Sequence, residues 1–130
     1  MKTKILIAVF FLIIFLVNGC GKKEAATEKE MPVDIKRNVV EINLTADRIM
    51  VPNNITIKKG TAVRFFNSDK NYRPNLLLYP AYVERPRKED IIVRSENINP
   101  GEYWEYVFEE PGRFTAKDIY SMMIGEITVE

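Results

Sequence analysis

From residue 38 to the C-terminus, the chain is a series of short segments in which apolar and polar residues alternate. Alternation with a period of two indicates β-strands that bury one face, and the Pro and Gly residues between the segments indicate turns. The alternating segments lie at residues 40–45, 55–58, 63–66, 103–108, 114–116 and 127–129. Residues 76–79 are apolar on both faces, residues 91–93 are a weaker strand, and a single helical turn is expected within residues 83–90. Seven or eight short strands predict an all-β sandwich.

A targeting segment precedes these strands. Lys2 and Lys4 come before an unbroken apolar run at residues 5–17, which is shorter than the roughly 20 residues that a membrane-spanning helix needs. A basic start and a short apolar run are typical of a secretory signal peptide. The run is followed by Gly19 and Cys20, the one cysteine of the chain. This ending resembles the lipobox of bacterial lipoproteins, which implies cleavage before Cys20 and attachment of lipid to its sulfur.

The sequence therefore predicts three parts. Residues 1–19 are the lipoprotein signal peptide, residues 20–37 are the lipidated cysteine and a flexible tether, and residues 38–130 are the folded domain. Residues 21–37 carry nine charged side chains and no aromatic one, so this stretch buries too little apolar surface to offset its ordering entropy. Two or more acyl chains anchor a protein stably. We expect an exported, membrane-anchored lipoprotein that faces the periplasm or the cell exterior.

Two absences restrict the chemistry of the chain. It has no histidine, and its one cysteine is expected to be acylated. A histidine base, a histidine-bearing metal site and an intrachain disulfide are therefore excluded. No nucleophile–base pair is available, so we expect a protein that is not an enzyme. The net charge of +1 predicts no binding to nucleic acid.

Three stretches, in this order along the chain, resemble the cupredoxin family. Residues 54–67, NITIKKGTAVRFFN, are similar to the family's second and third strands. Residues 108–114, FEEPGRF, resemble the approach to the metal loop, and residues 123–129, MIGEITV, resemble the final strand. Cupredoxins are Greek-key β-sandwiches, and many carry a blue copper for electron transfer in cell envelopes. The resemblance implies a cupredoxin-like Greek-key sandwich over residues 38–130.

The copper ligands of that family do not carry over. A blue-copper site needs two imidazoles and a thiolate with a weak axial ligand. By the resemblance, the first histidine is missing or replaced by Asn75, Asp118 stands in the place of the cysteine, and Met123 stands at the axial position. The loop between Asp118 and Met123 is shorter than the family's and holds no histidine. We expect no blue-copper site and no cofactor, with copper kept as an alternative.

Two non-standard metal sites stay open as alternatives. Met122, Met123 and Met50 would form a thioether site for Cu(I) if they converge, and carboxylates serve as ligands in some cupredoxin-like domains of uptake proteins. The carboxylates available for such a site are Asp118, Glu84, Glu89 and Asp90. The alternative function is thus a periplasmic copper or iron binding or electron-transfer protein. Its candidate metal ligands are Met123, Asp118, Asn75 and Met122.

The leading hypothesis is a lipid-anchored module that acts in recognition or assembly at the cell envelope. The stretch after the third strand is rich in arginine and tyrosine, the residue types enriched at interface hot spots. We expect Arg73, Arg85 and Arg87, framed by Tyr82, to bind an acidic envelope protein or an anionic envelope polymer. Such binding weakens as salt rises. The alternative is that carboxylates of the same stretch neutralise the arginines.

Overall fold

The computed structural model describes residues 37–130, so the predicted signal peptide, Cys20 and the tether up to residue 36 lie outside the described residues. The described part contains nine β-strands, one 3₁₀ turn (η1) and no α-helix. No helix in residues 37–130 has the length and hydropathy required to cross a membrane. The elements are β1 (Val39–Leu44), β2 (Met50–Val51), β3 (Asn54–Ile57), β4 (Thr61–Asn67), β5 (Leu76–Pro80), η1 (Lys88–Asp90), β6 (Val93–Arg94), β7 (Tyr103–Phe108), β8 (Gly112–Asp118) and β9 (Ile124–Val129).

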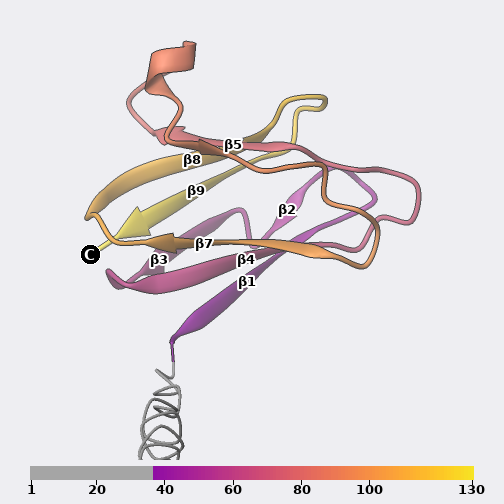
Figure 1. Cartoon of the computed structure of the whole chain (residues 1–130), viewed down its shortest axis with the longest axis horizontal. Coiled ribbons are helices and arrows are strands. Elements are labelled where there is room, and N and C mark those ends of the chain that lie inside the picture. The colour runs from indigo at the N-terminus through magenta and orange to yellow at the C-terminus, as the bar shows by residue number, and fades with distance from the viewer. Residues whose placement is uncertain (1–36) are drawn as a thin grey trace, which may run out of the picture. The chain divides into compact units, whose positions relative to one another are not determined.

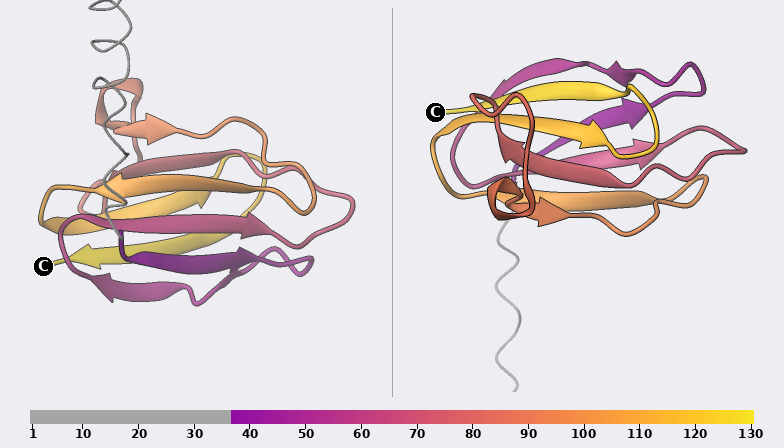
Figure 2. Two further views of the ribbon diagram at one scale, coloured as in Figure 1. Left: turned by 60° about the horizontal axis from the view of Figure 1, so that its bottom comes forward. Right: turned by 90° about the horizontal axis from the view of Figure 1, so that it is seen from above.

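The strands form two sheets that pack face to face (Figure 1, Figure 2). One sheet has four strands in the order β2-β1-β4-β7, and the other has five in the order β3-β9-β8-β5-β6. Strand β1 runs parallel to β4 and β3 runs parallel to β9, whereas the other neighbours are antiparallel. The all-β sandwich predicted from the alternating pattern is confirmed.

The alternation in the sequence becomes an inner and an outer face in each strand. In β9, Gly125, Ile127 and Val129 are buried, and the residues between them are exposed or half-buried. The inner faces of both sheets meet in one hydrophobic core, in which Phe65 of β4 is fully buried. Removing a large apolar side chain from water contributes about 1.5–3 kcal/mol, so this core stabilises the sandwich.

The differences from the predicted strands lie in the shortest elements. Strand β2 has two residues, Met50 and Val51, too few to show an alternating pattern in the sequence. Strand β6 is also two residues long, so only part of the weak strand predicted at residues 91–93 forms. The turn expected within residues 83–90 is present as η1.

The sandwich has two ends, which we name for one residue in each. The Asp118 end contains the loops at residues 45–49, 68–75, 95–102 and 119–123, and it lies on the right in Figure 1. The Gly60 end contains the loops at residues 58–60, 81–92 and 109–111, together with the C-terminus, on the left of that view. Asn38 also lies at the Gly60 end, because its carbonyl accepts a hydrogen bond from the Ala62 N–H at the start of β4 (2.9 Å).

The close packing of Gly125 in β9 generates a stability prediction. A Cβ at this position would lie 2.8 Å from the Met50 sulfur and 3.2 Å from the Asn53 carbonyl oxygen. That carbonyl already accepts the Glu126 N–H at 2.8 Å, so it is not free to move away. We expect Gly125→Ala to lower the free energy of unfolding by about 1–3 kcal/mol, as overpacking does, measured by urea denaturation.

The control is the double variant Met50→Ala with Gly125→Ala. If contact with the Met50 sulfur causes the loss, the effects of the two substitutions sum to more than the effect of the double variant. Strict additivity would contradict this explanation.

Candidate functional site

A buried carboxylate lies at the Asp118 end of the sandwich. Asp118 is the last residue of β8 and is fully buried. One of its oxygens, Oδ1, accepts the Asn75 backbone N–H at 2.8 Å. The other, Oδ2, accepts the Ser121 hydroxyl at 2.6 Å and also the Tyr72 hydroxyl. We call these four residues, Tyr72, Asn75, Asp118 and Ser121, the Asp118 network.

The strand register explains why these residues meet. Leu76, the first residue of β5, pairs with Asp118 at the end of β8, so the loop before β5 reaches the carboxylate. The loop after β8 turns back at once, because the Asp118 N–H donates to the Met123 carbonyl at 3.0 Å. Within this loop the Met123 N–H donates to the Ser121 hydroxyl oxygen at 3.2 Å. A buried carboxylate needs such donors, since burying a charge without partners is costly.

Tyr72 connects the network to an arginine. The Arg48 guanidinium carbon lies 3.3 Å from the centre of the Tyr72 ring, in a cation–π contact. Arg48 also forms an ion pair with the buried Asp69 at 3.5 Å. Burial raises the pKa of the Tyr72 hydroxyl above its ordinary value, and the hydrogen bond to Asp118 raises it further. The Tyr72 hydroxyl therefore stays protonated at neutral pH and donates a hydrogen bond to Asp118.

Asn67, the last residue of β4, holds the loop that carries Tyr72. Its side-chain amide donates to the carbonyls of Tyr72 (2.7 Å) and Ile98 (2.9 Å), and its amide oxygen accepts the Asp69 N–H (3.0 Å). Asn67 is fully buried and acts as a positioning residue for two loops of the Asp118 end. In the sequence, Asn67 is only the last residue of a strand motif. No sequence pattern predicts its role, or the roles of Ser121 and Tyr72 as partners of Asp118.

The Asn75 side chain does not belong to the network, although its backbone does. Its amide nitrogen donates to the Asn97 side-chain oxygen at 3.0 Å, and its amide oxygen accepts the Arg94 Nε–H at 2.7 Å. The structure therefore brings the Asn75 backbone to Asp118, while the Asn75 side chain binds the end of β6 and the segment after it. Each amide atom of Asn75 already has one hydrogen-bond partner in this arrangement.

The three methionines of the predicted thioether site differ in burial. Met123 and Met50 are both buried, whereas Met122 is 84% exposed. The Met50 sulfur packs against Gly125, so closely that a Cβ at residue 125 would lie only 2.8 Å from it. The carboxylates of Glu84, Glu89 and Asp90 lie in the loop at the Gly60 end, away from Asp118. Within residues 37–130, no group of three or more His, Cys, Asp or Glu side chains is placed to hold a metal ion.

The donors around Asp118 do not fit a blue-copper centre. Such a centre needs two imidazoles and a thiolate, but the chain has no histidine, and its one cysteine, Cys20, precedes the described part. The groups actually present are a carboxylate, a phenol and a hydroxyl, linked to one another by hydrogen bonds. The copper chemistry of a cupredoxin therefore has no ligand set at this end of the sandwich.

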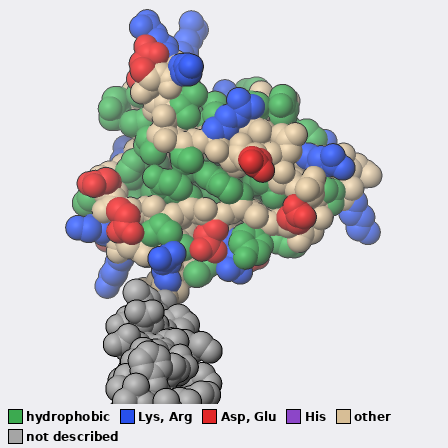
Figure 3. All heavy atoms as spheres, in the orientation of Figure 1, with side chains coloured by type: hydrophobic (Ala, Val, Ile, Leu, Met, Phe, Trp, Pro, Cys, Tyr) green, Lys and Arg blue, Asp and Glu red, His purple; other side chains and the backbone are tan. Residues whose placement is uncertain are grey.

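The four residues predicted to bind a partner are divided between the two ends. Arg73 precedes β5 at the Asp118 end, whereas Tyr82, Arg85 and Arg87 follow β5 at the Gly60 end. Strand β5 has five residues, or about 16 Å of extended chain, so Arg73 lies apart from the other three. Tyr82 is 85% exposed. At the tip of this loop, acidic and basic side chains are mixed (Figure 3), and Arg87 pairs with the carboxylate of Glu89 at 4.0 Å.

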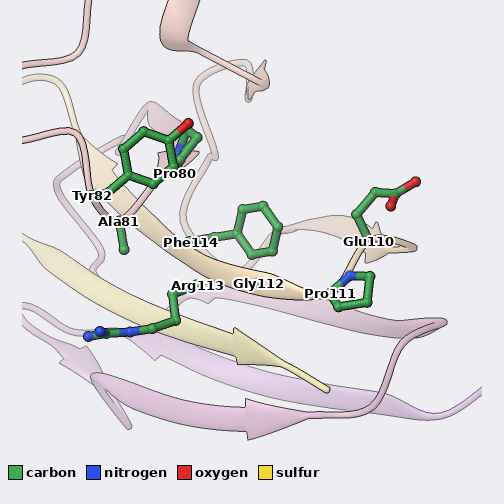
Figure 4. Close-up of a pocket in the computed structure, with 8 residues that line it drawn as sticks. All are labelled: Pro80, Ala81, Tyr82, Glu110, Pro111, Gly112, Arg113 and Phe114. Carbon is green, nitrogen blue, oxygen red and sulfur yellow. The ribbon is translucent and has the colours of Figure 1, made fainter.

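Tyr82 also borders a pocket of about 520 Å³ at the Gly60 end. Figure 4 shows the Phe114 ring between Tyr82 on one side and Pro111 on the other, with the Arg113 side chain turned away along the strand. The Arg113 guanidinium is bound to the Glu126 carboxylate at 2.7 Å. The pocket is lined by Pro80, Ala81, Tyr82, Glu110, Pro111, Gly112, Arg113 and Phe114. Its lining is mainly apolar, and no pattern in the sequence predicts it.

Solved structures of cupredoxins are similar to this chain. The Cu(I) form of an amicyanin variant matches with a TM-score of 0.60 at 13% identity, over 75% of this chain and 87% of that one. Auracyanin A, a "blue" copper protein from Chloroflexus aurantiacus, matches with a TM-score of 0.55 at 18% identity, over 71% and 98%. A copper-containing nitrite reductase from Thermus scotoductus SA-01 matches with a TM-score of 0.54 at 20% identity, over 70% of this chain and 22% of the reductase. No family model and no curated protein matches the sequence.

At these identities the likeness shows the fold alone. It confirms the cupredoxin-like Greek-key sandwich that the three sequence stretches implied. The Asp118 network, by contrast, is a feature of this chain's own side chains.

The raised pKa of Tyr72 generates a prediction about pH. The folded protein holds the phenolic proton more tightly than the unfolded chain does. The stability that Tyr72 adds is therefore complete below about pH 10 and is lost as the pH rises through the raised pKa. We expect Tyr72→Phe to lower the free energy of unfolding at neutral pH by about 1.5–3 kcal/mol, because a hydrogen bond to a carboxylate is removed. The variant should also lose stability less steeply than the wild type above pH 10, measured by urea denaturation across the pH range.

Tyr120→Phe is the matched control. Tyr120 is an exposed tyrosine outside the Asp118 network, so this variant should retain the steep alkaline loss that Tyr72 causes. An unchanged alkaline slope in Tyr72→Phe would show that the Asp118 network does not retain the proton.

Proposed function

We propose that the protein is a lipid-anchored, cupredoxin-like module of the cell envelope that acts in recognition or assembly and is not an enzyme. Its Asp118 end is held together by hydrogen bonds where a cupredoxin uses a metal. The observation that carries this proposal is that hydrogen-bond donors of the chain itself occupy both oxygens of the Asp118 carboxylate. Three donors reach its two oxygens, from the Asn75 backbone and from the Tyr72 and Ser121 hydroxyls.

The energetics of this arrangement support a metal-free role. A carboxylate offers about four acceptor sites, and three of them are used within the network. A metal ion at Asp118 would have to displace protonated hydroxyl groups, and the raised pKa of Tyr72 opposes formation of a phenolate ligand. The network thus supplies the cohesion of the loops from the chain's own residues.

The start of the described chain and most of the proposed partner-binding residues lie at the Gly60 end. The described chain begins at this end, where the Asn38 carbonyl is bonded to Ala62, and the loop with Tyr82, Arg85 and Arg87 lies at the same end. The arginines of this loop, Arg85 and Arg87, suit an anionic polymer or an acidic protein at the envelope surface. Rim charges of this kind mainly set the association rate and its salt dependence.

Metal titration tests the metal-free role. The Cys20→Ser chain has neither histidine nor cysteine, so added Cu(II) should give no intense visible band, because that band needs a copper–thiolate bond. Calorimetry should also show no tight, stoichiometric binding of Cu(I) or ferric iron. Tight binding that is lost in both Asp118→Ala and Met123→Leu would overturn the proposal in favour of a Met and carboxylate metal protein.

The anchor has a separate test. In the native host, labelled fatty acid should be incorporated into the wild-type chain and not into the Cys20→Ser chain, which should accumulate as an unprocessed precursor. A Lys22→Ser chain, altered beside the same cysteine, should be labelled normally. Equal labelling of the wild type and Cys20→Ser would exclude Cys20 as the lipid attachment site.

A further inference from the structure

One side of the sandwich leaves a full strand without a neighbour. Strand β7 is the last strand of its sheet and pairs only with β4. On the other sheet, the facing edge ends in β6, which is only two residues long. The side of the sandwich along β7 is therefore not covered by a further strand. In Figure 3, a band of hydrophobic side chains lies on this side of the molecule, at the level between β7 and the strands β5 and β8 of Figure 1.

The hydrogen-bond register shows which backbone groups of β7 face the open side. Asn67 donates its N–H to the Glu102 carbonyl at 2.9 Å, and Gly60 donates to the Phe108 carbonyl at 2.7 Å. In an antiparallel pair, the backbone groups that face the partner belong to every second residue. Like Glu102 and Phe108, Trp104 and Tyr106 therefore direct their backbone groups to β4. Tyr103, Glu105 and Val107 direct their N–H and C=O groups to the free edge.

An aromatic row lines the inner side of this edge. The rings of Trp104 and Tyr106 are 6.1 Å apart, those of Tyr106 and Phe108 are 4.9 Å apart, and Phe108 contacts Phe114 of the opposite sheet at 5.4 Å. Trp104 and Tyr106 are only half-buried, so part of each ring remains open to an incoming side chain. Two hollows follow the strand, one of about 400 Å³ beside Trp104 and one of about 240 Å³ beside Tyr106.

The edge lacks the devices that usually protect such strands. Natural edge strands carry prolines, bulges or unpaired charges that repel another strand. Strand β7 has no proline, and its one charged residue, Glu105, is bound to Arg64 of β4 at 3.2 Å. Arg64 also stacks on the Tyr103 ring at 4.2 Å. The outer face of the edge is thus neutral and fixed by its own contacts.

The two hollows and the free edge of β7 between them form a groove, which we call the β7 groove. The charges at its two ends indicate the chemistry of the occupant. Glu96 and Glu102 line the hollow beside Trp104, and Glu109 and Glu110 line the hollow beside Tyr106. The one arginine in these linings, Arg94, already binds the Asn75 side chain. Glu102 and Glu109 are seven positions apart, or about 24 Å of extended chain. An occupant with a basic residue near each end complements this groove.

We propose that β7 is a docking edge for an extended segment of a partner protein, with apolar side chains at alternate positions and Lys or Arg at its two ends. The segment adds a strand to the sheet by bonding to the backbones of Tyr103, Glu105 and Val107. Its alternate side chains enter the hollows beside Trp104 and Tyr106. Main-chain hydrogen bonds supply affinity in this mode, and the side-chain pockets supply specificity.

The same charges oppose pairing with a second copy of the chain. Antiparallel pairing of two β7 strands would place the Glu109 and Glu110 end of one copy against the Glu102 end of the other. Like charges brought together in this way are unfavourable. The linings of these hollows include no residue of the Asp118 network and none of Tyr82, Arg85 and Arg87, so this site stands or falls independently of the function proposed above.

The test uses Trp104, the one tryptophan of the chain, as its reporter. The full chain in mild detergent is titrated with the synthetic peptide Lys-Thr-Val-Thr-Val-Thr-Val-Lys, and Trp104 fluorescence should shift to shorter wavelength as the groove fills. Val107→Pro removes an edge N–H without touching the bonds to β4, as prolines in edge strands do. It should weaken binding by at least about tenfold, whereas the matched control Val107→Thr, which keeps the N–H, should change it by less than about threefold.

A second probe does not depend on the folding of a variant. A peptide N-methylated at the alternate amides that face β7 should fail to bind the wild-type chain, and the peptide methylated at the other amides should still bind. Replacing both lysines of the peptide with glutamates should also abolish binding. Equal binding of the two methylated peptides, or equal binding to Val107→Pro and the wild type, would overturn the proposal. Sedimentation showing a dimer that Val107→Pro dissociates would overturn it in favour of a second copy.

Discussion

The burial of the Asp118 carboxylate sets the architecture of one whole end of the sandwich. A fully buried carboxylate is tolerated only where donors satisfy its oxygens. Here the donors come from the loop before β5 and from the loop after β8. The loop before β5 must therefore bring Tyr72 inward, and the loop after β8 must turn back tightly enough to present Ser121. Arg48 and Asn67 hold Tyr72 in place from a third and a fourth segment. One buried charge thus couples segments that lie far apart in the sequence.

This coupling explains where sequence reasoning succeeds and where it stops. Strands β1, β3 and β9 are predictable because their side chains alternate between the core and more exposed positions, a local property of each segment. The place of Asp118 could be inferred by resemblance, because it follows Gly112 at a fixed spacing. Its partners could not, since Tyr72 lies 46 positions away and is brought near only by the register of β5 and β8. Strand β5 separates Arg73 from Arg85 and Arg87, although the three are close in sequence. Arg73 precedes the strand, whereas Arg85 and Arg87 follow it.

The groove along β7 depends on another non-local property, the unequal edges of the two sheets. The alternation in β7 predicts an inner row of aromatic residues, and the structure has this row. Nothing local in the sequence shows that β6 stops after two residues and leaves the row partly open. A longer β6 would place more backbone and side chains across the inner edge and close the hollows. The exposure of Trp104 and Tyr106 is therefore a consequence of the short β6 rather than of their own segment.

A cupredoxin-like sandwich places two different kinds of site at different parts of its surface. The end with the Asp118 network is a set of loops whose positions are fixed by hydrogen bonds, and those bonds occupy the groups that a ligand would need. The edge at β7 has the opposite property, because its backbone groups and aromatic faces are held rigidly in the sheet and yet have no partner among residues 37–130. Binding is favoured where groups are preorganised and unsatisfied. By that criterion, the hydrogen bonds of the Asp118 network stabilise the loops that they join, whereas the edge at β7 is the surface that we propose for docking of a partner segment.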